Sequence, residues 1–274
     1  MARQAENTRT LPDFDNPPAV ETVIAVHFAS LEQWNVQHFG LFWNEIRNEY
    51  PRVVVHPSIG PSAMEFKLDF DADLSSPRVE LLPLRCWFYN QGESRLIQLQ
   101  NNCFAHNWRK VGGDDPYLHY DPLKSIFESE WGRFCSFLKR EGLPSPTVVH
   151  CEVTYINHLD KGKGWNVFSD LPSVIPSWTG ATSGTYLPPP QMVMINSFYP
   201  MDKQDGRLQI EVRPAIRQSD SKQTLQLTLS GRCRPSSSEG SDVLRALDSA
   251  REWVVRGFAD FTSPAMHQHW RRKI

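Results

Sequence analysis

The stretch that decides the fold is residues 95–110, RLIQLQNNCFAHNWRK. Apolar and polar residues alternate on both sides of Asn101 and Asn102, and asparagine tolerates the positive φ angles of tight hairpin turns. A two-residue loop at these asparagines pairs Gln100 with Cys103, and each earlier residue of the first strand then pairs with the next residue of the second strand. The resulting antiparallel hairpin has an apolar face of Ile97, Leu99, Phe104, His106 and Trp108. Its polar face carries Gln98, Gln100, Ala105, Asn107 and Arg109.

The polar face of this hairpin is the first candidate binding site, with Gln98, Gln100, Asn107 and Arg109 as its residues. Amide side chains and one guanidinium form a hydrogen-bonding surface that can receive a peptide, another protein or a nucleotide base. The alternative is that these groups bond neighbouring backbone or water, with Arg109 paired to an acid such as Glu152.

The opposite face offers no nucleophilic pair. His106 lies between two aromatic residues and is expected to be a satisfied core residue that helps to anchor the hairpin to a helix. Cys103 is near it in sequence but points to the other face, so a Cys/His catalytic pair is not expected.

Outward from this hairpin, the sequence predicts further strands and three amphipathic helices. A first helix at 31–49 would be capped by Ser30, a second would open at Asp121 and Pro122, and a last one at 241–262 would be capped by Ser241. Strands are expected at 19–28, 52–56, 64–70, 147–159, 191–199, 207–213 and 223–232, besides the hairpin and the strand before it.

This order predicts an α+β fold built from two similar antiparallel-sheet halves, each with amphipathic helices packed on its sheet. Residues 1–18 are an N-terminal arm, 19–146 the first half and 147–274 the second, packed as one compact unit. Both halves run from a strand through antiparallel strands to a tryptophan-bearing helix (Trp131, Trp253), which indicates a degenerate internal duplication.

The composition of the chain disfavours several classes of protein. The chain has 274 residues, a formal net charge of -2 and five scattered cysteines without a C-x-x-C pair. Such cysteine usage is typical of reduced thiols in a cytoplasmic protein. No apolar run resembles a signal peptide or a membrane span, and the balanced charge disfavours a dominant polyanion-binding field.

Three segments carry a resemblance to a known family: NPPAVETVIAVHF, LIQLQNNCFAHNWRK and CEVTYINHL, with a closing MHQHWRR. Together they resemble a sporadically distributed family of bacterial proteins of this length whose function is unassigned. The resemblance brings no catalytic residues. Patchy distribution is what genes in mobile elements or defence loci show, so it implies a role in bacterial defence or toxin neutralisation by association only.

Recognised site motifs are otherwise absent from the sequence. There is no phosphate loop, and His267 with His269 lacks the further ligands of a zinc site, so neither a cofactor nor a metal is predicted. The Pro- and Gly-rich loop at 160–190 is long enough to be a binding flap presenting Trp165 and Trp178. Its aromatic residues packing over their own sheet is the alternative.

The favoured hypothesis is a non-enzymatic protein-binding or assembly component that uses a sheet face and the 160–190 loop, and a homo-oligomer is compatible with it. One alternative is a nucleic-acid-binding protein with Trp108, Arg109, Lys110 and the terminal WRRK as contacts. The other is an enzyme with an unrecognised site near His106, Glu152 or His158.

Overall fold

The computed structural model describes residues 10–58, 84–112, 116–180, 184–201, 205–217 and 220–273. Within them, nine strands form one antiparallel sheet in the order β2-β3-β4-β5-β1-β6-β9-β8-β7. The strands are β1 (Ala19–Phe28), β2 (Arg52–Pro57), β3 (Leu84–Tyr89), β4 (Arg95–Gln100), β5 (Cys103–Arg109), β6 (Val148–Asp160), β7 (Ile195–Pro200), β8 (Gly206–Ile216) and β9 (Gln223–Cys233). The strand expected at 64–70 lies outside the described residues.

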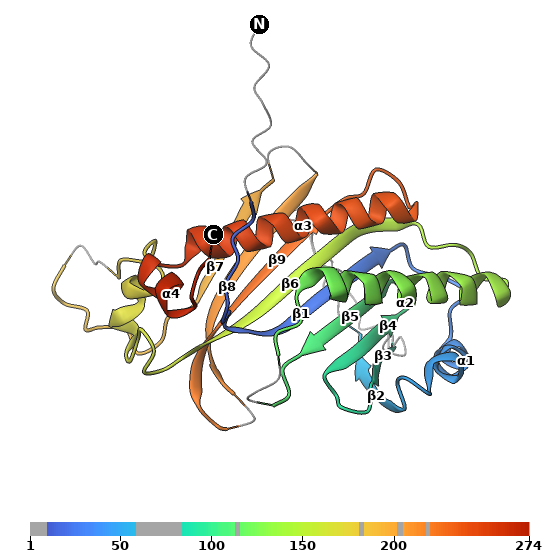
Figure 1. Cartoon of the computed structure of the whole chain (residues 1–274), viewed down its shortest axis with the longest axis horizontal. Coiled ribbons are helices and arrows are strands. Elements are labelled where there is room, and N and C mark those ends of the chain that lie inside the picture. Colours follow the sequence, from blue (N-terminus) through green and yellow to red (C-terminus); the bar gives the residue numbers. More distant parts are fainter. Residues whose placement is uncertain are drawn as a thin grey trace, which may run out of the picture.

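The helices lie on one face of this sheet (Figure 1). They are α1 (Val36–Ile46), α2 (Tyr120–Arg140), α3 (Gly240–Phe261) and the short α4 (Pro264–His269), with a 3-10 turn η1 (Phe168–Ser173). Phe42 of α1 shows how they meet, because its ring contacts Phe88 and Phe104 of the sheet and Phe134 of α2. Aromatic burial of this kind between helices and sheet supplies the main stabilisation of the fold. The α+β class is therefore confirmed.

The hairpin has the predicted register. Gln100 pairs with Cys103 and Ile97 with His106, and the turn falls on Asn101 and Asn102. Ile97, Leu99, Phe104, His106 and Trp108 are all buried, and the four apolar residues among them belong to the core under the helices.

Three predicted helix starts were wrong. Helix α1 begins after Asn35, whose side chain accepts from the Gln37 backbone N–H while His38 accepts from the Asn35 N–H. This reciprocal cap gives Asn35 an advantage over Ser30. Helix α2 starts one residue before Asp121, which occupies the first turn, and α3 starts at Gly240 rather than after Ser241.

The centre of the sheet is the antiparallel pair β1–β6, which joins residues of the first half of the chain to residues of the second. A register shift follows the His27–His150 pair in this ladder. Such β-bulges twist a strand locally and re-aim its side chains. No helix in the described part of the chain is long and apolar enough to cross a membrane.

Candidate functional sites

The sheet face opposite the helices, called the polar face below, carries the predicted amide site. Arg85 of β3 donates to the Gln98 side chain at 3.2 Å, and Gln98 donates to Asn107 at 2.8 Å. Asn107 in turn donates to the Glu21 carboxylate at 2.5 Å. Four strands are thus linked by one chain of side-chain hydrogen bonds, so Gln98 and Asn107 are paired within the protein.

The other two predicted residues are also engaged. Gln100 is buried and donates to Asn102 at 2.5 Å. Arg109 lies 3.9 Å from Glu21, the residue directly opposite it on β1. The expected pairing of Arg109 with Glu152 was wrong, because Glu152 binds Arg232 instead. Burial raises the pKa of Glu21, whereas Asn107 and Arg109 lower it.

A second polar network continues across β6, β9 and β8. Arg232 donates to Glu152 at 2.6 Å and to Gln209 at 3.0 Å. The other Glu152 oxygen accepts from the Thr154 hydroxyl at 2.9 Å. Burial alone would raise the pKa of Glu152, but Arg232 and His27 beside it bring the pKa below its usual value. Glu152 is therefore ionised at neutral pH, and Arg232 and Thr154 fix the position of its carboxylate.

Two histidines lie against this carboxylate. The rings of His27 on β1 and His150 on β6 stack with centroids 4.3 Å apart, and His27 Nε2 is 3.9 Å from Glu152 Oε2. Burial lowers the pKa of His150 to about 3 and also lowers that of His27, so both rings are neutral at physiological pH. Cys103 Sγ approaches the same His27 Nε2 at 3.9 Å.

Sequence reasoning missed this cluster because only the β1–β6 and β1–β5 ladders bring its members together. The available signal was the spacing of His150 and Glu152, two residues apart on a strand and hence on one face. No comparable spacing in the sequence links His27 or Cys103 to these two residues.

The cluster is not arranged for nucleophilic catalysis. A catalytic histidine takes the proton of its nucleophile on one ring nitrogen while a carboxylate holds the other ring nitrogen. Here Cys103 and Glu152 both approach the same nitrogen, Nε2 of His27, so the ring cannot play that role. Burial also raises the pKa of the Cys103 thiol far above its usual value. The chemistry this arrangement offers is ligand donation.

His106 is a core residue, as predicted, but only one of its two ring nitrogens is paired, since Nε2 is buried without a hydrogen-bond partner in the described part of the chain. Its Nδ1 lies 2.6 Å from Glu130 of α2, and the other Glu130 oxygen accepts from Tyr50. His106 shares a face with Ile24 and Val153, whereas Glu152 and His158 of β6 point to the opposite face of the sheet, so the three residues of the enzyme hypothesis do not form one site.

The 160–190 loop packs part of its aromatic content on its own structure. Trp165 is buried, with its indole N–H donating to the Leu159 carbonyl at 3.0 Å, and Trp178 is partly buried against the core. Trp165 is therefore not presented to solvent as the flap prediction required, whereas Trp178 remains partly exposed. Exposed apolar residues begin further on, at Tyr186, Leu187, Met192 and Met194, just before edge strand β7.

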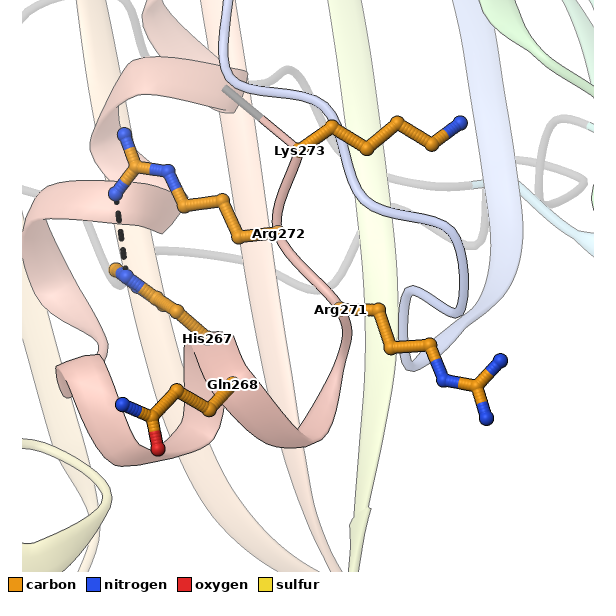
Figure 2. Close-up of a pocket in the computed structure, with 5 residues that line it drawn as sticks. All are labelled: His267, Gln268, Arg271, Arg272 and Lys273. Atoms are coloured by element: carbon orange, nitrogen blue, oxygen red, sulfur yellow. Dashed lines mark hydrogen bonds between the residues drawn. The ribbon is translucent and has the colours of Figure 1, made fainter.

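An open pocket of about 470 Å³ lies at the C-terminus. Figure 2 shows its lining: His267, Gln268, Arg271, Arg272 and Lys273. Arg272 lies 3.2 Å from His267, Lys273 is 2.7 Å from Asp15, and Arg271 points away from the other four side chains. Trp108 and Trp270 are both buried, so the base-stacking part of the nucleic-acid hypothesis was wrong.

Comparison with known proteins adds no assignment: no protein-family model, curated protein or solved structure matches the chain. The resemblance to a sporadically distributed bacterial family stays a prediction.

Proposed function

We propose that the protein is a non-enzymatic binding component that takes an extended segment of a partner protein at edge strand β7. The observation that carries this proposal is the uncharged and largely exposed strip formed by residues 184–200, which runs into β7, the last strand on one side of the sheet in the described part of the chain. Tyr186 is 95% exposed, Leu187 65%, Met192 61% and Met194 64%.

An edge strand is normally protected from pairing with other chains. Proteins place lysine, inward charges or covering segments at such edges, since unpaired backbone groups recruit further strands. The strip at 184–200 has no charged residue at all. Its methionines are also the flexible, polarisable side chains that adapt to a binding partner. A strip of this composition suits strand addition by a partner, with main-chain hydrogen bonds giving affinity.

A foreign segment fits this edge better than a second copy. The residues of β7 whose backbone groups point away from β8 are Asn196, Phe198 and Pro200, because Met201 and its alternate neighbours bond β8. If two β7 strands paired antiparallel around Phe198, Asn196 of each copy would face Pro200 of the other. Proline has no N–H to donate, so both ends of that ladder would lose a hydrogen bond. A partner strand without proline at that position avoids this loss, and an uncharged apolar segment would match the strip.

The test is a selection from an unbiased displayed-peptide library on the immobilised full chain. We expect enrichment of peptides with alternating apolar residues and low charge. Their binding should fall at least about tenfold with Met194→Glu or Tyr186→Glu, because a buried charge is left unpaired. Val55→Glu, an exposed apolar position on the opposite edge strand β2, is the matched control and should leave binding unchanged.

Two results would overturn the proposal. One is no enrichment that depends on Met194 or Tyr186. The other is a stable dimer in light scattering that Met194→Glu dissociates, since this would show that edge strand β7 binds a second copy of the chain.

The nucleic-acid alternative retains one observation, the three basic side chains at the C-terminal pocket. Lys273 is held by Asp13 and Asp15, which lowers the net positive charge there. Among the residues that the structure describes, the pocket has no exposed aromatic ring on which a base could stack. The nucleic-acid alternative is therefore less well supported than the binding of a protein segment at the uncharged edge.

We also propose that the chain arose by internal duplication. Outward from the central pair, β1 is followed in space by β5, β4 and β3, and β6 by β9, β8 and β7. Each half closes with a long helix, α2 or α3. This correspondence supports the two-halves prediction, while the link to a defence locus stays a prediction from resemblance.

A further inference from the structure

We propose that His27, His150 and Glu152 bind one divalent transition-metal ion of the zinc class, with the Cys103 sulfur as fourth ligand. This inference is independent of the binding edge at β7, because the cluster lies on β1, β5 and β6 in the middle of the sheet. One ligand atom from each of the three residues lies within 4.8 Å of the other two.

The donor set fits such an ion. Zinc in proteins takes four ligands from imidazole nitrogen, thiolate sulfur and carboxylate oxygen. Two imidazoles, one carboxylate and one thiol supply that set, and the softness of sulfur and nitrogen disfavours calcium or magnesium.

His150 gives an independent indication. The residue is 4% exposed, yet neither Nδ1 nor Nε2 has a hydrogen-bond partner in the described part of the chain. Buried polar groups are nearly always paired, so an orphaned ring facing another imidazole and a carboxylate points to a missing ligand. His27 and His150 face each other directly in the β1–β6 ladder, which places the two rings side by side.

The carboxylate already has the supporting contacts of a metal ligand. Arg232 donates to Oε2 and Thr154 to Oε1, which fixes the orientation of Glu152. Each carboxylate oxygen accepts about two hydrogen bonds or ligand bonds, so Oε2 keeps a lone pair for the ion. Outer partners of this kind orient ligands in known metal sites.

Binding requires a local rearrangement. The two rings are nearly parallel, with an angle of 14° between them, so their in-plane lone pairs do not meet at one point. Ligand bonds of about 2.0–2.3 Å bring donors in a tetrahedron to roughly 3.5 Å from one another. The rings must therefore unstack and close around the ion, and the Cys103 thiol must release its proton to solvent.

The experiment titrates Zn²⁺ or Co²⁺ into the chelator-treated full chain. We expect one ion per chain, tetrahedral Co²⁺ absorption with a thiolate charge-transfer band, and a raised melting temperature with Zn²⁺. His150→Asn or Glu152→Gln should weaken binding at least about 100-fold, since even outer partners cost 10–100-fold. Cys103→Ser should abolish the charge-transfer band.

Controls separate this site from adventitious binding. All variants carry His269→Asn, which removes the exposed histidine of the terminal HQH. His158→Asn, on the same strand and face as His150, should leave the affinity unchanged. Circular dichroism shows whether each variant is folded. Binding that survives His27→Asn and Glu152→Gln in folded protein, a spectrum without the thiolate band, or no binding at micromolar protein would overturn the proposal.

Discussion

Glu130 lies on the buried face of helix α2, where it joins two groups that come from different parts of the chain. It accepts from the Tyr50 hydroxyl and lies 2.6 Å from His106 Nδ1. Burial first, and then the Glu130 charge, raise the pKa of Tyr50 far above its usual value, so the phenol remains a donor. The trio anchors the end of α1 and strand β5 to α2.

Replacing Glu130 with alanine is expected to lower the free energy of unfolding by about 3 kcal/mol. The loss arises because His106 and Tyr50 keep their burial but lose their shared acceptor. Urea unfolding measures it. Glu128→Ala, at an exposed position on the same helix, should change stability by less than about 0.5 kcal/mol. Equal effects of the two substitutions would show that the buried carboxylate of Glu130 does not stabilise the fold.

At the scale of elements, helix α3 approaches strand β9 closely enough to require a glycine. A Cβ atom at Gly231 would stand 2.5 Å from the Ala250 carbonyl oxygen. Gly231→Ala should therefore force the helix away from the sheet and destabilise the protein by about 1–3 kcal/mol.

Gly132 in α2 is the matched control, because a Cβ there meets no atom within 4 Å. Gly132→Ala should raise stability by up to about 1 kcal/mol, since alanine favours the helix. Thermal unfolding of both variants tests the pair. Two shifts of the same sign would contradict the close approach of α3 to β9.

The same elements show what the sequence could predict. The hairpin at 95–110 was predictable to the residue, because Asn101 and Asn102 specify the turn locally and alternation then assigns each side chain to a face. Helix starts were less predictable, since Asn35 gains its capping advantage from a histidine partner rather than from a standard Ser, Asp or Glu pattern. The β1–β6 pairing was not predictable, because nothing local records which distant strand lies beside β1. The cluster of His27, His150 and Glu152 depends on that pairing.

At the scale of the whole molecule, the two halves share their interior. Residues from both belong to one hydrophobic core, and β1 pairs with β6 along most of its length. Tyr120 and Lys124 of α2 both contact Asp248 of α3, at 3.2 and 2.7 Å, so the helices are also joined across the halves. Separating the halves would expose the apolar faces of β1 and β6 and leave two new sheet edges.

This shared interior predicts that the two halves unfold together. Glu130→Ala lies in the first half and Gly231→Ala in the second, yet each should accelerate hydrogen exchange in the slowest amides of both β5 and β9. The reason is that the most protected amides exchange through global unfolding, whose free energy either substitution lowers. Exchange measured by mass spectrometry on peptides covering 95–110 and 223–233 tests this. Acceleration confined to the half that carries the substitution would show that the halves are separate folding units.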